Sequence, residues 1–319
     1  MSRYVVSLGG NALGNNAEEQ KELLKGVAKS IVHLIKLGNE VIIVHGNGPQ
    51  VGMINLAFTE STSAPDMPFP ECGAMSQGYI GFHIQNAIQN ELKEQGIKRN
   101  VVTLVSQVLV DKDDPMFKNP TKPVGAFYSE EEAKKIAAEK GYTMKEDAGR
   151  GWRRVVASPL PIDVIEKESI SSLVKNGDIV ICAGGGGIPV IQKGDKLEGI
   201  AAVIDKDYAS AKVAELVGAD YLVILTAVDN VYINFNKPDQ KKLERVSKAE
   251  MEEYLNTDYF AKGSMYPKVN ACVKFLNKAP GKTAIISSLA KAPEAFATSA
   301  YIIRKRRADN RRNAGWPCR

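Results

Sequence analysis

The sequence lacks the apolar run of about 18 residues that a membrane-spanning helix needs. Its N-terminus passes from Met1 directly into a strand-like segment, without the basic region and cleavage site of a secretory leader, so we expect a cytoplasmic protein without a membrane partner. The four cysteines are far apart and show no C-x-x-C spacing, which argues against a zinc site and a disulfide framework. With 319 residues, 44% hydrophobic and 25% charged, the chain is long enough for one large globular domain or two lobes.

Histidine is also scarce, with three residues in the chain. His33 and His83 lie on expected helices and only His45 adjoins a glycine turn, so none is expected to take part in chemistry. The sequence shows no Ser/His/Asp or Cys/His arrangement of the kind used in nucleophilic catalysis. No cluster of metal ligands is visible either, so the protein is expected to hold no metal itself, and any metal would be Mg²⁺ carried by the phosphates of a nucleotide.

Positive charge is concentrated at the end of the chain. The net charge is +5, but residues 304–319 hold seven basic residues and one acid; without them, 35 basic residues face 36 acidic ones. This segment has no apolar periodicity that could dock it, so we expect a disordered tail and no nucleic-acid partner. RNA or membrane-surface attachment is the alternative interpretation, and it requires the tail to be native.

Strand-like apolar runs alternate with amphipathic helical stretches along the chain. This alternation predicts an α/β fold with a parallel or mostly parallel sheet covered by helices on both faces. The stretch 111–161 breaks the pattern with prolines and glycines, and we expect one helix there, Glu130 to Lys140, flanked by loops. We interpret it as an insertion that projects from the sheet, a candidate lid. The expected strands are 4–8, 41–44, 101–105, 179–183, 221–225 and 283–287, and the expected helices are 18–37, 76–95, 207–217 and 266–277.

Two glycine-rich turns follow the first two strands, at 9–14 and 46–52, and a glycine tetrad at 184–187 follows a later one. Glycine lets backbone N–H groups close on an anion, and strands that end in such turns place the anion at the carboxyl edge of a sheet. Asn11 and Asn47 can add side-chain donors. The three turns together predict a cradle for a phosphoryl group or a carboxylate-like oxyanion.

The common nucleotide-binding motifs do not fit these turns. Neither the turn at 9–14 nor the turn at 46–52 has the G-x-G-x-x-G spacing of a dinucleotide fingerprint, which disfavours a nicotinamide dehydrogenase. The segment 279–283 ends like a phosphate-binding P-loop, but Leu276 stands where the first glycine is required, so it is interpreted as a turn before a strand.

Phosphoryl transfer requires cations that neutralise the charge of the transferring group. Three lysines stand in turn or motif settings: Lys122 between two prolines, Lys206 between two aspartates, and Lys268 after a proline. Lys206 is the strongest candidate, because a flanking carboxylate can orient it toward a phosphate at the start of a helix.

With these residues collected, nearly the whole chain resembles the carbamate kinases of the amino-acid kinase superfamily. Eight ordered segments carry the resemblance: SLGGNAL at 7–13, HGNGPQVG at 45–52, ECGAMSQGYIG at 71–81, NPTKPVG at 119–125, GGGGIPV at 184–190, AVIDKD at 202–207, LTAVD at 225–229 and GSMYPK at 263–268. Near its end the chain departs from the family, because residues 299–303 replace a Gly-Thr pair and the basic tail follows.

The resemblance implies a three-layer αβα architecture with an open, mainly parallel eight-stranded sheet and a small protruding subdomain at 111–161. Residues 1–303 would form the kinase domain, in which about 1–205 bind carbamate or carbamoyl phosphate and about 206–303 bind the nucleotide. The implied reaction is ATP + carbamate ⇌ ADP + carbamoyl phosphate with Mg²⁺. It is catalysed by a homodimer, and the family runs it toward ATP in fermentative arginine degradation.

The resemblance also assigns roles to individual residues. The catalytic set would be Lys122, Lys206, Asp207 and Lys268, with Lys122 reaching from the protruding subdomain. The cradle for carbamate and the transferred group would be Gly9, Gly10, Asn11, Gly46, Asn47 and Gly48. The nucleotide would contact Gly184, Gly185, Ala227, Val228, Tyr232, Met265, Pro267 and Lys268. Two alternatives stay open: a related amino-acid kinase with another acceptor, and a catalytically silent protein of this fold that senses nucleotides.

Overall fold

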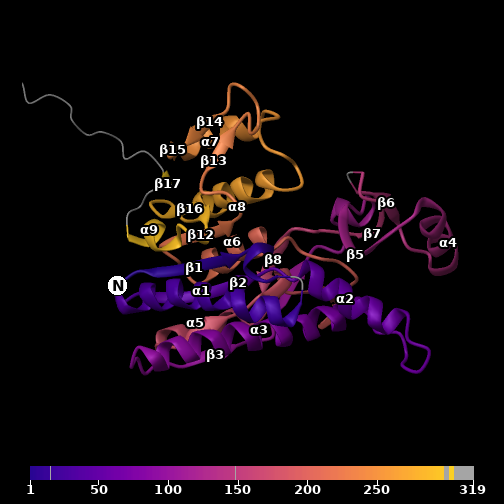
Figure 1. The fold of residues 1–319 in the computed structure, drawn as a ribbon, viewed down its shortest axis with the longest axis horizontal. Coiled ribbons are helices and arrows are strands. Elements are labelled where there is room, and N and C mark those ends of the chain that lie inside the picture. The colour runs from indigo at the N-terminus through magenta and orange to yellow at the C-terminus, as the bar shows by residue number, and fades with distance from the viewer. Residues whose placement is uncertain (15, 148, 298–301, 305–319) are drawn as a thin grey trace, which may run out of the picture.

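The computed structural model describes residues 1–14, 16–147, 149–297 and 302–304 (Figure 1), so most of the basic tail, 305–319, lies outside the described residues. Within that part the largest sheet has eight strands, and six of them, from β16 to β3, run parallel; β17 pairs antiparallel with β16, and β15 pairs parallel with β17. The prediction of an eight-stranded, mainly parallel sheet is confirmed. Across the sheet the order is β15 (Arg245–Ser247), β17 (Ile302–Arg304), β16 (Thr283–Ser288), β12 (Tyr221–Thr226), β1 (Arg3–Leu8), β2 (Glu40–His45), β9 (Ile179–Ile181) and β3 (Val101–Thr103).

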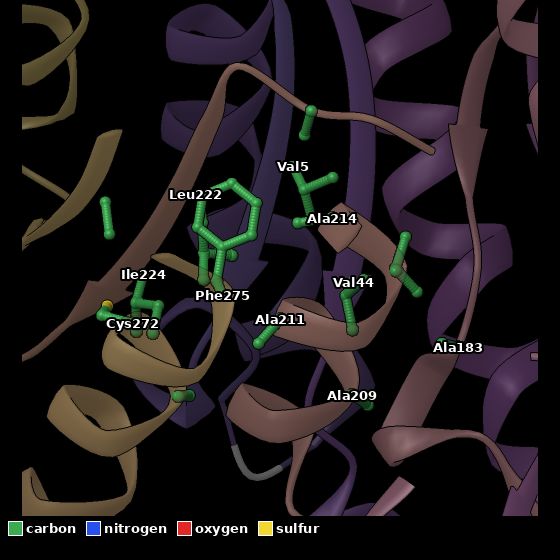
Figure 2. Packing of buried hydrophobic residues seen from close by; sticks show 14 of the residues in the cluster. Val5, Val44, Ala183, Ala209, Ala211, Ala214, Leu222, Ile224, Cys272 and Phe275 are labelled. Atoms are coloured by element: carbon green, nitrogen blue, oxygen red, sulfur yellow. The ribbon is translucent and has the colours of Figure 1, made fainter. Parts of the chain in front are cut away.

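Helices cover both faces of this sheet because its strands are apolar on both faces. In β1, Val5 packs against one helical layer while its neighbours Tyr4 and Val6 pack against the other. Figure 2 shows the first layer, where Phe275 and Cys272 of α8 lie against Leu222 and Ile224 of β12. This layer contains α5 (Lys167–Lys175), α6 (Lys206–Leu216), α7 (Lys248–Leu255) and α8 (Met265–Lys278); the other contains α1 (Ala17–Lys36), α3 (Phe69–Glu94) and α9 (Ala292–Ala297).

The segment that carries Lys122 stands apart from this sandwich. Figure 1 shows α4 and the strands β5, β6 and β7 projecting beyond one end of the molecule. The predicted helix is confirmed as α4 (Glu130–Lys140), and the Ser129/Glu132 capping box explains its start. The expectation of flanking loops is wrong: β5 (Lys122–Tyr128), β7 (Trp152–Val156) and β6 (Met144–Glu146) form an antiparallel sheet. An irregular register between Val124 and Tyr128 and the arginines of β7 hide the usual alternation.

Between the projecting segment and the sandwich, two backbones touch. A Cβ on Gly52 of α2 (Gly48–Thr59) would lie 2.7 Å from the Gly125 nitrogen of β5, so only glycine permits this approach. A small apolar cluster that includes Val51, Phe69 and Val124 packs beside this contact. The projecting segment is therefore fixed to the N-terminal end of α2 and α3.

The remaining strands form two smaller sheets. They are β11 (Lys196–Gly199), β10 (Ile188–Lys193), β4 (Gln107–Val110) and β8 (Pro161–Val164) in one, and β13 (Val231–Ile233) and β14 (Lys241–Leu243) in the other. Short 3₁₀ turns stand at Gly10–Ala12 (η1), Pro115–Phe117 (η2) and Gly184–Gly186 (η3). Among the described residues, no helix is both long and apolar enough to cross a bilayer.

Candidate active site at the carboxyl edge of the sheet

The first two glycine turns leave the sheet side by side. Leu8 at the end of β1 is in register with His45 at the end of β2, and the Gly46 N–H donates to the Leu8 carbonyl at 3.0 Å. After these strands, η1 begins at Gly10 and α2 begins at Gly48. The first turn of a helix leaves backbone N–H groups without intrahelical partners, so two sets of donors face the same region.

The outer glycines of these turns are open. Gly10 and Gly48 are exposed, and a Cβ on either would meet nothing within 4 Å. Asn11 lies in η1, but its side chain belongs to the part of the chain that the structure does not describe. Open space beside unpaired backbone donors is what a small anion requires.

The inner glycines have a different role, because they make room for a lysine. A Cβ on Gly46 would lie 3.3 Å from Lys206 Cδ, and a Cβ on Gly9 would lie 3.0 Å from the Leu225 carbonyl oxygen and 3.9 Å from Lys206 Cε. The aliphatic part of Lys206 thus passes between the two turns. Its ammonium group ends beside Ser7 and Asp207.

Lys206 and Lys268 converge on one buried carboxylate. Lys206 Nζ donates to Asp207 Oδ1 at 2.5 Å, and Lys268 Nζ donates to Asp207 Oδ2 at 3.2 Å. The Asp207 side chain is 2% exposed, whereas the two lysine side chains retain 14% and 17%. The carboxylate therefore holds two ammonium groups that still reach the surface of the site.

The balance of charges keeps Asp207 ionised. Burial alone would raise the pKa of this carboxyl, but the nearby charges and hydrogen bonds of Lys206 and Lys268 outweigh it and hold the pKa well below its ordinary value. Two cations against one anion leave this cluster with an excess positive charge. Such an excess favours binding of an anion with several charges, as in phosphoryl transfer.

Lys122 reaches the same region from the projecting segment. Its ammonium donates to Asp205 Oδ2 at 2.8 Å, while Asp205 Oδ1 accepts the Asp207 backbone N–H at 2.9 Å as the N-cap of α6. Lys122 and Lys206 are therefore linked through adjacent residues of one helix start. The structure brings together all four residues predicted as catalytic: Lys122, Lys206, Asp207 and Lys268.

The glycine tetrad lies against the second turn. A Cβ on Gly184 would stand 2.3 Å from His45 Nε2, and one on Gly185 would stand 2.1 Å from Asn47 Nδ2. Asn47 is buried and donates to Ser76 Oγ at 2.8 Å, which fixes the start of α2. Gly184 and Gly185 thus pack against His45 and Asn47, the residues on either side of Gly46 in the second turn.

Five other residues predicted for the nucleotide lie in the turn after β12, in β13 and at the start of α8. Ala227 and Val228 occupy the turn after β12, Tyr232 lies in β13, and Met265 and Pro267 lie in the first turn of α8. All five are exposed or half-buried. Two buried oxygens nearby, Asn230 Oδ1 beyond this turn and Ser287 Oγ opposite Leu225, have no hydrogen-bond partner among the described residues.

Sequence reasoning assigned no role to Ser7 or Ser264. Ser7 Oγ donates to Asp207 Oδ1 at 3.1 Å and accepts from Lys206 Nζ at 3.3 Å, and the Ser264 carbonyl accepts from Lys268 Nζ at 3.2 Å. A hydroxyl inside an otherwise apolar strand was the available signal for Ser7. No side-chain pattern signals a backbone carbonyl such as that of Ser264.

His45 is buried beside the cradle, and burial lowers the pKa of its imidazole to about 4 despite a 2.8 Å contact between Nδ1 and the Gly46 carbonyl. Neutral and enclosed, it supports the turn. Within the described residues, no group of three or more His, Cys, Asp or Glu side chains could hold a metal ion.

Known proteins share both this sequence and this fold. The model of the amino acid kinase family matches residues 2–287. A carbamate kinase of Clostridium perfringens is 55% identical over 303 residues, which cover 92% of this chain and 96% of that protein. Carbamate kinase 3 of Staphylococcus aureus is 54% identical over 293 residues, covering 91% and 95%.

Solved structures agree with the sequence matches. The carbamate kinase from Giardia lamblia bound to AMP-PNP has a TM-score of 0.89 and 42% identity, covering 96% of this chain and 99% of that one. Sequence and fold therefore match the same group of phosphotransferases along almost the whole chain. The protein belongs to the amino acid kinase family.

Proposed function

We propose that this protein is a carbamate kinase, which transfers a phosphoryl group reversibly between ATP and carbamate. One observation carries the proposal: Lys206 and Lys268 converge on buried Asp207 beside two open helix starts. The identity to carbamate kinases over more than nine-tenths of the chain supports the choice of acceptor.

The two lysines would stabilise the group in transfer. In phosphoryl transfer the protein mainly positions the reactants and neutralises charge on the equatorial oxygens. Lys206 and Lys268 already point their ammonium groups to one place, and Asp207 with Ser7 fixes them there. Little reorganisation is then needed when the charge develops.

The acceptor would bind at the glycine turns. Backbone N–H groups at the starts of η1 and α2, with Gly10, Asn11, Gly48 and Asn47, offer donors to a carbamate oxygen or to the phosphoryl group. Gly9 and Gly46 would belong to this cradle because they leave room for the Lys206 side chain. Gly184 and Gly185 would support it through their contacts with His45 and Asn47.

Residues 111–161 would act as a lid over this cradle. Lys122 at the start of β5 is tied to Asp205, next to Lys206, so the segment closes directly over the reacting groups. Carbamate and carbamoyl phosphate are both labile in water, and exclusion of water protects them. The division into an acceptor part, about 1–205, and a nucleotide part, about 206–303, belongs to this proposal.

The nucleotide would lie along α8 and the turn after β12. Ala227, Val228, Tyr232, Met265 and Pro267 would border the adenine nucleotide, with Lys268 at its phosphates. The unpaired oxygens of Asn230 and Ser287 are further polar groups at this end. The relative from Giardia lamblia was solved with AMP-PNP, which supports ATP or ADP as the ligand.

Mg²⁺ would accompany the nucleotide. Asp207, the buried acid of the site, is already paired with two lysines and is a poor metal ligand in that state. Mg²⁺ commonly keeps several waters and binds through substrate phosphates, so the phosphates of ATP or ADP would hold it here. The metal would add charge neutralisation to that of the lysines. A cytoplasmic homodimer is the assembly that the resemblance favours.

The test is ATP formation from ADP and carbamoyl phosphate in the presence of Mg²⁺. We expect turnover in the parent and a loss of about 10²-fold or more in Lys206→Ala and in Lys268→Ala, because removing a preorganised charge donor costs roughly 3 kcal/mol. Lys274→Ala, on the exposed side of α8, is the matched control and should retain activity. Undiminished activity in both site variants would contradict the assigned roles.

The same assay separates the alternatives. A folded parent that binds ATP without turning over carbamoyl phosphate would favour the nucleotide sensor. Transfer from ATP to an amino acid or N-acyl amino acid, with none to or from carbamate, would identify another amino-acid kinase. Both results are distinct from simple misfolding, which circular dichroism detects.

A further inference from the structure

A cavity lies outside the site described above. It has a volume of about 300 Å³ and is enclosed by α2, β5 and α4, with Tyr142, Met144 and Arg154 completing its wall. It lies behind the Gly52–Gly125 contact, between the sandwich and the projecting segment. None of the residues proposed for catalysis lines it.

Arg154 is the unusual group in this cavity. Its guanidinium lies 3.7 Å from the Tyr142 ring centroid and 5.4 Å from that of Phe69, and Nη1 donates to Asn55 Oδ1 at 3.2 Å. Within the described residues it has no salt bridge to a carboxylate. Its neighbours differ: Arg150 and Arg153 both pair with Asp147.

Burial makes the missing carboxylate significant. Desolvation lowers the pKa of the Arg154 guanidinium, so the charge has given up water without gaining an acidic partner. Its planar face is held by Tyr142, and among the described residues its one hydrogen-bond acceptor is Asn55 Oδ1, which is bound by Nη1. An arginine fixed in this way is prepared for a bidentate carboxylate.

Charged groups of both signs occupy the rest of the cavity wall. Glu60 at the end of α2 lines it, and so do Glu132, Lys135, Glu139 and Lys140 of α4, of which Lys135 and Glu139 pair at 4.0 Å. After burial itself, the carboxylates of Glu60 and Glu132 are the main charges that raise the pKa of Tyr128, while Arg154 acts in the opposite sense, so Tyr128 lies within range of both signs. Glu132 is engaged with Ser129 at 2.8 Å, whereas Glu60 has no ion pair among the described residues.

The rest of the lining is apolar. Leu56 of α2, Ile136 of α4 and Met144 contribute hydrocarbon surface between the charged groups. Because the wall carries both signs, a simple anion would face Glu60, Glu132 and Glu139, and a simple cation would face Arg154, Lys135 and Lys140. A ligand with both charges and a short apolar side chain meets every part of the wall.

We propose that this cavity is a binding site for a small α-amino acid with an apolar side chain, its carboxylate on Arg154 and Asn55 and its ammonium group toward Glu60. The ligand would bridge α2 of the sandwich and β5 and α4 of the projecting segment. Because β5 begins at Lys122, occupancy of the cavity would bias the position of that lysine over the catalytic site.

Calorimetry on the full chain tests the site independently of catalysis. L-leucine is the probe, and 4-methylpentanoate and 3-methylbutylamine are its analogues without the amino and the carboxylate group. We expect saturable binding of L-leucine and at least about 10-fold weaker binding of either analogue, since each leaves one charged group of the cavity unpaired.

Three variants test which side chains contact the bound L-leucine. Arg154→Gln should weaken L-leucine binding by about 10-fold or more, while Arg150→Gln, an exposed arginine of the same segment, should bind like the parent. Glu60→Gln, at an exposed helix end, should fold normally and should lose most of the preference for L-leucine over 4-methylpentanoate.

Three results would overturn the proposal: no saturable binding of L-leucine to the parent, equal binding in Arg154→Gln, or equal binding of L-leucine and 4-methylpentanoate to the parent. If Arg154→Gln does not fold, the change of preference in Glu60→Gln decides the matter by itself. An unchanged preference in Glu60→Gln then contradicts the proposal. None of these readouts depends on phosphoryl transfer.

Discussion

Gly46 and Lys206 lie so close that a Cβ on the glycine would stand 3.3 Å from Lys206 Cδ. Gly46 has no positive φ, so the stem of the lysine, and not the backbone conformation, is what crowds a side chain there. The glycine turn and the catalytic lysine therefore constrain each other, although 159 residues separate them in the chain.

Gly46→Ala should lower turnover more than stability. The added methyl pushes the Lys206 stem by a few tenths of an ångström, and a displaced catalytic group can cost on the order of 10-fold to 10²-fold in rate. Steady-state kinetics of ATP formation measures the effect. Gly26→Ala on α1, where a Cβ meets nothing within 4 Å, is the control and should keep full activity. Equal rates in both variants would show that the stem tolerates the methyl.

Lys122→Ala should leave the fold intact and weaken closure over the cradle. The side chain is 35% exposed and its partner is Asp205, so its removal costs little stability, about 1 kcal/mol or less. Because a positioned cation at the transferring group is lost, kcat/KM for carbamoyl phosphate should fall by about 10²-fold. Lys118→Ala, an exposed lysine shortly before it, should behave like the parent. A parent-like kcat/KM in Lys122→Ala would remove this lysine from the site.

Asp207→Asn should destabilise the protein and alter its response to acid. Loss of the buried charge leaves two ammonium groups unopposed, which costs about 3 kcal/mol at pH 7. The folded pKa of Asp207 is below the ordinary value of 3.8, so its stabilising contribution is complete above that value and is lost as pH falls through the folded pKa.

Chemical denaturation at pH 7, 5 and 3 measures this contribution. The difference in unfolding free energy between the parent and Asp207→Asn should be constant from pH 7 to 5 and smaller at pH 3. Asp195→Asn, in an exposed hairpin, should show no such difference. A gap that widens on acidification would contradict the assigned ionisation.

His45 should affect stability in mildly acidic solution. Its folded pKa of about 4 is below the ordinary 6.5, so the unfolded chain takes up a proton in this window while the folded chain does not. Stability therefore falls as pH decreases from 6.5 toward 4, by roughly 3 kcal/mol at about 1.4 kcal/mol per unit. Chemical denaturation of the parent and of His45→Gln at pH 7 and 4.5 measures this effect. The unfolding free energy of His45→Gln should fall less between these two pH values than that of the parent. An unchanged dependence would mean that His45 is hydrated in the folded protein.

The hydrophobic pattern of the sequence predicted those strands and helices in which buried residues recur at regular spacing. The alternation of strands and helices predicted the parallel sheet because each strand is apolar on both faces, as Val5 and Val6 show. Helix α3 begins at Phe69, earlier than the expected residue 76, because Pro70 is accepted in a first helical turn. Helix α2 was not expected, since its sequence has no single apolar stripe.

Glycines show the limit of sequence reasoning most clearly. The turns at Gly9 and Gly46 predicted an anion cradle, yet these two residues make room for a side chain that arrives from residue 206. Gly184 and Gly185 stay predicted for the nucleotide, and the sequence did not foresee that they also pack against His45 and Asn47. Contacts between such distant segments depend on the tertiary arrangement, which spacing along the chain does not encode. The lysines were singled out by their turn settings and, for Lys206, by its flanking aspartates, and the resemblance to one family assigned their roles.

Asp205 uses both of its carboxylate oxygens, one on the start of α6 and the other on Lys122. The position of the Lys122 ammonium group is therefore set by Asp205, which directly precedes Lys206 in the chain. Asp205 is joined to Lys206 by the chain and to Lys122 by an ion pair, so a small shift at the start of α6 would move both ammonium groups together. The projecting segment, held against α2 at the Gly52–Gly125 contact, thus keeps its lysine in register with Lys206.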